Sequence, residues 1–193
     1  MSAVRRNWLR LIVSGASLLL LAPALAAQAP ARASEPQYPP SSPEAVAAML
    51  KLAAVTKSDV VYDLGSGDGR IPIAAARTYG ARAVGIDIDP ALVQDATRNA
   101  RDAGVSDKVR FLAQDLFTTD ISPATVVSLY LTPFLNFKLL PKLNRELKPG
   151  TRVVSHQWEM MDPSDKYEYK PDQKLIVGNS FIYVWTVPIV RKV

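Results

Sequence analysis

A short apolar strand that ends in a glycine-rich turn limits the folds open to this chain. Residues 60–64 have the sequence VVYDL, which is typical of a parallel strand covered on both faces. The next six residues, GSGDGR, allow a tight turn and let a ligand come close to the backbone. The stretch at 71–79 then predicts a helix that ends at Gly80. In an open α/β sheet, this order places a ligand beyond the carboxyl end of the strand.

Strands and helices alternate through the rest of the chain. Further strands are predicted at residues 82–86, 109–112, 125–130 and 152–155, and two closing strands at 174–177 and 181–187. Helices are predicted after Ser42, between Asp89 and Gly104, and at 137–147, with Ser42 and Asp89 as capping residues. This pattern predicts an α/β fold with a Rossmann-like, doubly wound, mostly parallel sheet, a terminal antiparallel hairpin and a single domain.

The N-terminal segment is set apart from this pattern. Three arginines lie within the first ten residues, an apolar run follows at 11–25, and Ala24-Leu25-Ala26 offers small residues for a signal peptidase. We therefore expect a signal peptide at 1–26, a flexible linker at 27–41 and the folded domain at 42–193. The run Arg5-Arg6-Asn7-Trp8-Leu9 also resembles a twin-arginine export signal, and a chance arginine pair in an ordinary signal is the alternative.

This layout predicts export to the periplasm, and a membrane anchor formed by an uncleaved N-terminus is the alternative. The formal net charge of +5 depends on the same segment, because its three arginines face no acidic residue. Without them, 20 of the 23 basic residues remain against 18 acidic ones. The rest of the chain is close to neutral, so its charge gives no argument for nucleic-acid binding.

The chain has no cysteine and one histidine, His156. This composition excludes disulfides, thiolate zinc sites, cysteine nucleophiles and metal sites built from several histidines. We expect no metal centre.

Three acidic residues stand at the predicted ends of neighbouring strands: Asp63, Asp87 and Asp115. The glycine spacing is G-x-G-x-G rather than the dinucleotide pattern G-x-G-x-x-G, and Asp63 and Asp68 would repel a pyrophosphate. Carboxylates suit a cationic nucleoside instead. Asp63 can pair with an ammonium, Asp87 with ribose hydroxyls and Asp115 with an adenine amino group.

S-adenosylmethionine (SAM) carries all three of these groups. The residues predicted to bind it are Asp63, Gly65, Ser66, Gly67, Gly69, Asp87 and Asp115. Turn glycines without a ligand, and a turn-closing role for Asp115, are the alternatives.

At these residues the chain resembles the class I SAM-dependent methyltransferases, over roughly residues 38–190. The resemblance rests on the segments VYDLGSGDGR, AVGIDID, FLAQDL, SLYLTP and LKPGTRVVSH. The first and last are similar to a subgroup of small bacterial relatives of a mitochondrial protein-lysine methyltransferase. The resemblance implies a Rossmann-like fold, SAM as cofactor and an acceptor nucleophile such as a protein lysine amine. Those relatives have a sequence closer to SHDFDMGDW where this chain has SHQWEMMDP at 155–163, so lysine specificity does not transfer directly.

Two residues near the ends of the fourth and fifth strands are the candidates for catalysis. The methyl group of SAM is already activated, so a protein mainly aligns the reactants and excludes water. A lysine acceptor must first lose a proton, which calls for a low-dielectric pocket or a weak base. Tyr130 and His156 are predicted to position or deprotonate the acceptor. The alternatives are a structural histidine, and packing roles for Tyr130, Thr132 and Asn136.

A non-catalytic, exported SAM- or nucleoside-binding module on the same fold is the competing function. It is motivated by the export signal, because SAM is made in the cytoplasm. A nicotinamide oxidoreductase is disfavoured by the glycine spacing.

Overall fold

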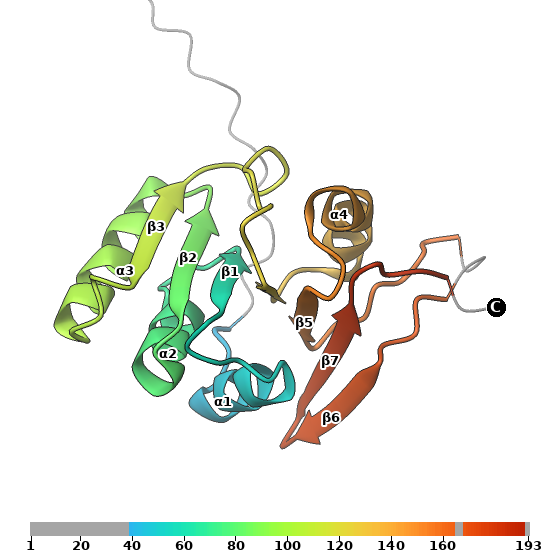
Figure 1. The fold of residues 1–193 in the computed structure, drawn as a ribbon, viewed down its shortest axis with the longest axis horizontal. Coiled ribbons are helices and arrows are strands. Elements are labelled where there is room, and N and C mark those ends of the chain that lie inside the picture. The colour runs from blue at the N-terminus through green and yellow to red at the C-terminus, as the bar shows by residue number, and fades with distance from the viewer. Residues whose placement is uncertain (1–38, 165–167, 192–193) are drawn as a thin grey trace, which may run out of the picture. The chain divides into compact units, whose positions relative to one another are not determined.

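A seven-stranded mixed sheet forms the centre of the protein (Figure 1). The computed structural model describes residues 39–164 and 168–191, so the predicted signal peptide and the linker up to residue 38 lie outside the described residues. The strands are β1 (Val60–Leu64), β2 (Arg82–Asp87), β3 (Val109–Ala113), β4 (Val126–Leu129), β5 (Arg152–His156), β6 (Gln173–Val177) and β7 (Ser180–Thr186). The helices are α1 (Pro43–Leu52), α2 (Arg70–Tyr79), α3 (Pro90–Asp102) and α4 (Pro133–Glu146).

The strand order is β3-β2-β1-β4-β5-β7-β6. Strands β1 to β5 are parallel, and β7 pairs antiparallel with both β5 and β6. The predicted parallel sheet with a terminal antiparallel hairpin is therefore confirmed. The order reverses between β1 and β4, and the crevice beyond the carboxyl ends of strands at such a reversal is where open α/β sheets bind ligands.

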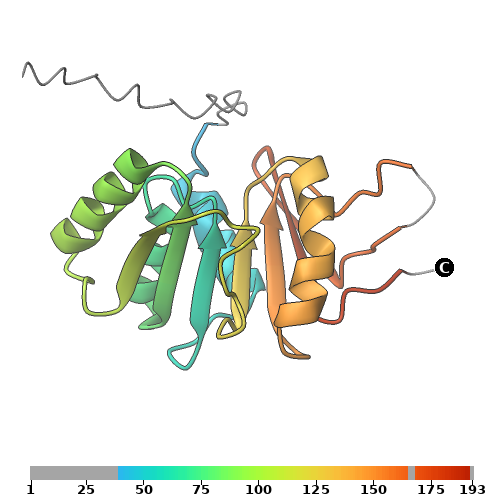
Figure 2. The same ribbon diagram turned by 90° about the horizontal axis from the view of Figure 1, so that it is seen from above.

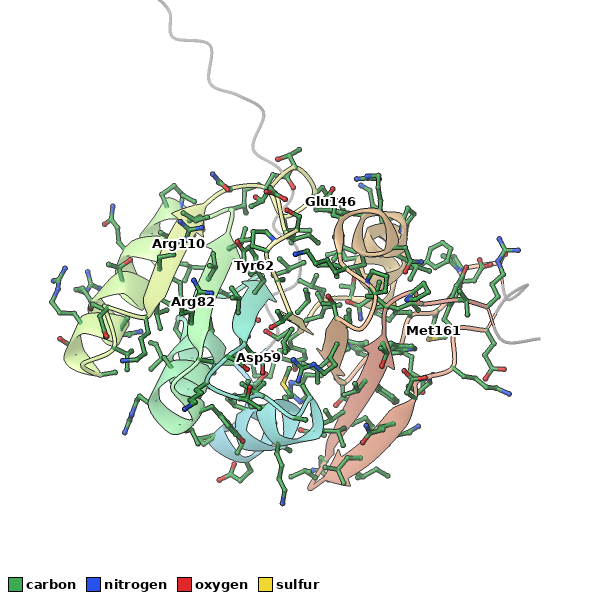
Figure 3. The ribbon with its side chains drawn as sticks, viewed as in Figure 1. Asp59, Tyr62, Arg82, Arg110, Glu146 and Met161 are labelled. Carbon is green, nitrogen blue, oxygen red and sulfur yellow. The ribbon has the colours of Figure 1, made fainter. Side chains whose placement is uncertain are left out.

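Helices cover both faces of this sheet, with α4 on one side and α1 and α2 on the other (Figure 2). The core on the side of α1 and α2 includes Met49 and Ile71, and α3 adds Ala100 to it. The core on the opposite side includes Leu139 and Leu143 of α4. Tyr62, labelled in Figure 3, belongs to this second core. Burial on both faces explains why the central strands β1 and β4 are mostly apolar in the sequence.

The capping predictions hold, and one helix boundary differs. Ser42 caps α1 by accepting a hydrogen bond from the amide of Ala45, and Asp89 caps α3 through the amide of Ala91. Helix α4 begins at Pro133, four residues before the predicted start, with Thr132 as its cap. The apolar spacing used for the prediction begins at 137, whereas a capping threonine before a proline is itself a helix-start signal.

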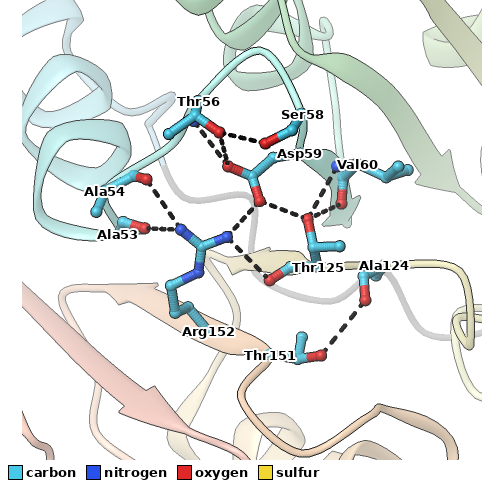
Figure 4. A network of polar contacts seen from close by, with 10 residues as sticks. All are labelled: Ala53, Ala54, Thr56, Ser58, Asp59, Val60, Ala124, Thr125, Thr151 and Arg152. Atoms are coloured by element: carbon cyan, nitrogen blue, oxygen red, sulfur yellow. Dashed lines mark hydrogen bonds and ion pairs between the residues drawn. The ribbon is translucent and has the colours of Figure 1, made fainter.

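An arginine on β5 joins several elements near the amino ends of the strands (Figure 4). The guanidinium of Arg152 donates to the backbone carbonyls of Ala53 and Ala54, at 2.9 Å each, and forms an ion pair with Asp59. The carboxylate of Asp59 also accepts hydrogen bonds from Thr56 and Thr125. Arg152 therefore connects the end of α1 with the segments that lead into β1 and β4.

Burial by itself would raise the pKa of Asp59. The hydrogen bonds from Thr125 and Thr56 and the charge of Arg152 outweigh this effect and lower the pKa below its ordinary value. A carboxyl group with a lowered pKa stabilises the fold above its unfolded-state pKa, and this stabilisation is lost as the pH falls. The role of Arg152 in the LKPGTRVVSH segment is thus structural.

We predict that Arg152→Met lowers the free energy of unfolding at neutral pH by about 3–5 kcal/mol, because it leaves the buried Asp59 carboxylate without its cation. Arg145→Met is the matched control, since Arg145 pairs with Glu146 at the exposed surface of α4. The control should cost less than about 1 kcal/mol. Urea unfolding of both variants measures the difference, and equal losses would contradict this role for Arg152.

Candidate functional site

Asp63 is a buried carboxylate next to the point where the strand order reverses. It lies on β1 with 2% of its surface exposed. Its neighbour on β4 is Ser128, whose hydroxyl donates a hydrogen bond of 2.7 Å to Oδ1 of Asp63. Burial raises the pKa of Asp63 to about 7, and the negative charges of Asp87 and Asp68 contribute to the rise. A ligand cation would stabilise the ionised form and thereby gain affinity.

The second predicted acid, Asp87, holds the glycine-rich turn in place. Its Oδ2 atom accepts a hydrogen bond of 2.8 Å from the amide of Gly67, and its Oδ1 atom accepts one from the amide of Asp89. The amides of Gly65 and Ser66 both donate to the carbonyl of Ile86. The turn after β1 is therefore attached to the end of β2. The sequence placed Asp87 at the site, but no motif indicated its bond to Gly67.

The three glycines of the turn have different surroundings. Gly65, Gly67 and Gly69 have φ angles of 84°, 51° and 81°, in the left-handed region that favours glycine. A Cβ atom on Gly69 would lie 2.5 Å from the ring of Phe111, and one on Gly65 would lie 2.9 Å from Leu131. A Cβ on Gly67 would meet nothing within 4 Å. Gly65 and Gly69 therefore permit close packing, whereas Gly67 borders open space that a ligand can enter.

Two further predicted ligands lie in the turns after β1 and β3. Ser66 is 5% exposed, and its hydroxyl has no hydrogen-bond partner within the described residues. Asp115 accepts a hydrogen bond of 2.9 Å from the amide of Phe117 and closes the turn after β3. This bond agrees with the turn-closing alternative, and the adenine contact of Asp115 stays a prediction.

Tyr130 and His156 are in direct contact at the ends of β4 and β5. Their ring centroids are 4.1 Å apart, with 38° between the ring planes. His156 is 4% exposed, and burial lowers its pKa, so the imidazole is neutral near neutral pH. The Nδ1 atom lies 2.7 Å from the hydroxyl of Ser41. A neutral, partly desolvated imidazole is suited to act as a weak base.

Sequence reasoning missed Ser41. It lies in the segment assigned to the linker, but it is 4% exposed and belongs to the compact unit that begins at Pro39. The one available signal was its position directly before the capping residue of α1.

The other candidates on the acceptor side have structural partners. Thr132 caps α4, and the buried Asn136 donates to the Ser155 hydroxyl and to the Trp158 carbonyl. These bonds support the packing alternative for both residues. Gln157, directly after His156, has a φ of 70°, which is unusual for a residue with a side chain. No group of histidine, aspartate and glutamate side chains suited to a metal ion occurs in residues 39–164 and 168–191.

Comparison with known proteins identifies the family. The family model described as the ANTKMT methyltransferase domain matches residues 63–166, more than half of the chain. The chain belongs to this methyltransferase family. The match begins at Asp63 and includes Asp87, Asp115, Tyr130 and His156.

Relatives and a solved structure agree with this assignment. A protein-lysine N-methyltransferase from Saccharolobus islandicus is 40% identical over 148 residues, which cover 76% of this chain and 92% of the relative. The adenine nucleotide translocase lysine N-methyltransferase of Mus musculus is 38% identical over 100 residues, which cover 52% of this chain and 44% of that protein. An RNA methyltransferase from Salinibacter ruber, crystallised with S-adenosyl-L-homocysteine, is 52% identical, with a TM-score of 0.73 over 77% of this chain and 94% of that chain.

The protein is therefore a SAM-dependent methyltransferase with SAM as its cofactor, as predicted. These findings favour an enzyme over a non-catalytic binding module. The roles of the individual residues stay predictions that rest on the geometry above.

We predict that the affinity for SAM rises with pH between about pH 5.5 and 7.5. With the pKa of Asp63 raised to about 7, the carboxyl group is mostly protonated at the lower pH and cannot pair with the ammonium of SAM. Its ionisation should lower the dissociation constant about 20-fold over this range. Isothermal titration measures the change, and a flat profile for the unmodified protein would contradict the assignment.

Asp63→Asn should remove this pH dependence. The control Asp68→Asn should retain it with a midpoint at lower pH, because the charge of Asp68 contributes to the raised pKa of Asp63. In the ligand-free protein, ionisation of Asp63 has the opposite effect: it lowers the stability of the fold. Because the pKa of Asp63 is raised in the folded state, its contribution to stability is present at low pH and is lost as the pH rises through about 7. Asp63→Asn should therefore raise the Tm of the ligand-free protein at pH 8 more than at pH 5.

Proposed function

We propose that this enzyme transfers the methyl group of SAM to the ε-amino group of a lysine in a protein acceptor. The observation that carries the proposal is the 40% identity to the Saccharolobus islandicus protein-lysine N-methyltransferase, over 92% of that protein's length. The structure supports it with a buried, neutral His156 and the adjacent Tyr130 at the ends of β4 and β5, on the strands that lie beyond the order reversal.

SAM supplies an electrophilic methyl group on a sulfonium. Asp63 would hold the ammonium of the cofactor, and Asp87 would accept hydrogen bonds from its ribose while it keeps the Gly67 turn in place. The open space above Gly67 lets the ligand lie against the backbone. These contacts would fix the sulfonium, and alignment of this kind can lower the activation free energy by about 7–11 kcal/mol.

Proton removal is the chemical task that a lysine acceptor adds. An ordinary lysine has a pKa of about 10.4, so presenting the neutral amine at neutral pH costs about 4–5 kcal/mol. Desolvation near Tyr130 lowers this cost because it disfavours the ammonium form. His156 would take the proton, the amine lone pair would form the new C–N bond, and the C–S bond electrons would leave with the sulfur.

RNA methylation is the second candidate, because the Salinibacter ruber structure, 52% identical to this chain, is described as an RNA methyltransferase. The charge of the chain does not favour it. Outside the first 26 residues, 20 basic residues face 18 acidic ones, which is close to balance for a protein that would bind a polyanion.

We predict that labelled SAM transfers its methyl group to protein in cell-envelope or cytoplasmic fractions, and that hydrolysis of the labelled protein yields methylated lysine. The label should resist ribonuclease. His156→Gln should lower the rate about 100-fold or more, as expected for loss of a base, with little change in the dissociation constant of SAM. Label that is recovered in methylated nucleosides would support the RNA candidate and overturn the lysine proposal.

We also propose that the enzyme is exported and that residues 1–26 are removed. The arginines, the apolar run and the Ala24-Leu25-Ala26 sequence support this proposal. Within residues 39–164 and 168–191, no helix is long and apolar enough to cross a membrane. An uncleaved anchor formed by the N-terminal segment is the alternative.

We predict that residues 1–40 fused to mature β-lactamase, which folds in either compartment but protects cells from ampicillin only outside the cytoplasm, give an active reporter. Replacement of Arg5 and Arg6 by lysine should block export if the twin-arginine route is used and leave it unchanged if the route is the general one. An inactive fusion in both forms would overturn the export proposal. Release of the reporter from membranes distinguishes a cleaved signal from an anchor.

A further inference from the structure

A polar chain of four residues links the glycine-rich turn to the candidate catalytic histidine. Asp68, within the turn, binds the guanidinium of Arg70 through two carboxylate oxygens, at distances of 2.5–3.2 Å. Another guanidinium nitrogen of Arg70 donates a hydrogen bond of 2.6 Å to the backbone carbonyl of Ser41. The hydroxyl of Ser41 lies 2.7 Å from Nδ1 of His156. The backbone carbonyl of Ser41 is therefore held by Arg70, next to the glycine-rich turn, and its hydroxyl contacts the candidate catalytic histidine.

The position of Ser41 is also fixed along the chain. It directly precedes Ser42, which caps α1, and α1 packs against β5 and β7. Ser41 and His156 are separated by 115 residues, so only the folded protein brings them together. A buried hydrogen bond of this length, with its serine held on both sides, restricts the orientation of the imidazole ring.

We propose that Ser41 is a positioning residue for methyl transfer: its hydroxyl accepts the Nδ1–H hydrogen of His156 and thereby leaves Nε2 as the proton acceptor. The proposal rests on the proposed transfer to a lysine amine, in which His156 takes the proton. Nδ1 is occupied by Ser41, so Nε2 is the ring nitrogen left for chemistry. A hydroxyl can accept a hydrogen bond from Nδ1–H or donate one to Nδ1, so the direction of this bond, acceptance by Ser41, is the part that we propose.

A neutral partner has a different effect from the carboxylate found in hydrolase triads. A carboxylate orients the histidine and also stabilises the imidazolium that forms. A serine hydroxyl orients the ring without adding a negative charge, so His156 stays neutral in its buried position and is ready to accept a proton. In the proposed reaction, His156 takes the proton from the acceptor amine before the methyl group moves.

The single histidine makes the tautomer directly measurable. In uniformly ¹⁵N-labelled protein without a histidine tag, every imidazole signal belongs to His156. Long-range ¹H–¹⁵N spectra at neutral pH should show a proton on Nδ1 in the unmodified full chain. Ser41→Ala should move the proton to Nε2, and Ser41→Thr, which keeps a hydroxyl, should retain it on Nδ1. An Nε2-protonated ring in the unmodified protein, or an unchanged tautomer in Ser41→Ala, would overturn the proposal.

Kinetics separate positioning from a purely structural role. Ser41→Ala should lower kcat 10- to 100-fold, with the KM for SAM unchanged within a factor of two, and Ser41→Thr should restore most of the rate. Ser42→Ala is the matched control, because it removes a neighbouring hydroxyl that caps α1 and does not contact His156. This control should lower the Tm and leave kcat and the tautomer unchanged. A lower Tm in Ser41→Ala without a change in kcat would overturn the positioning role.

The spectroscopic measurement needs no acceptor. If no methylated lysine is found but the tautomer changes as described, the lysine proposal fails and the control of His156 by Ser41 stands. If lysine is methylated and the tautomer is insensitive to Ser41, the lysine proposal stands and the control of His156 by Ser41 fails.

Discussion

The hydrogen bond between the Gly67 amide and the Asp87 carboxylate is the interaction on which the proposed cofactor site depends. It ties the turn after β1 to the end of β2, which fixes the glycine-rich turn relative to the carboxylate proposed to hold the ribose of SAM. The turn can come so close because glycines at 65 and 69 leave room for Leu131 and Phe111. At Gly67, the open space leaves room for the ligand in the proposed site. The backbone conformation of the turn therefore allows close packing at two glycines and leaves space for a ligand at the third.

Two buried aspartates on the same chain segment show how the protein separates stability from function. Asp59, before β1, has an arginine and two threonines as partners, and its pKa is lowered. Asp63, on β1, has a serine hydroxyl as its one side-chain hydrogen-bond partner among the described residues, and burial together with nearby acids raises its pKa to about 7. The first carboxylate stabilises the fold when ionised. The second is destabilised when ionised, and in the proposed site it would gain a cation from the ligand.

The acceptor side is assembled from parts that lie far apart in the sequence. His156 comes from β5, Tyr130 follows β4, and Ser41 precedes α1. Arg70 connects this group to the turn that borders the cofactor. One short polar chain thus joins the glycine-rich turn to the histidine.

The sequence by itself determined the sheet and placed the residues predicted to bind the cofactor at the ends of its strands. Apolar runs that end in glycine and aspartate specify parallel strands through local pattern, and the order of acids at Asp63, Asp87 and Asp115 places them along one edge of the sheet. Those features are local, so they can be found without coordinates. The start of α4 at Pro133 also has a local signal, the capping Thr132 before a proline. The bond from Gly67 to Asp87 and the contact of Ser41 with His156 were decided by the tertiary structure. These two contacts join residues that are 20 and 115 positions apart in the sequence. No local sequence pattern predicts contacts over such separations.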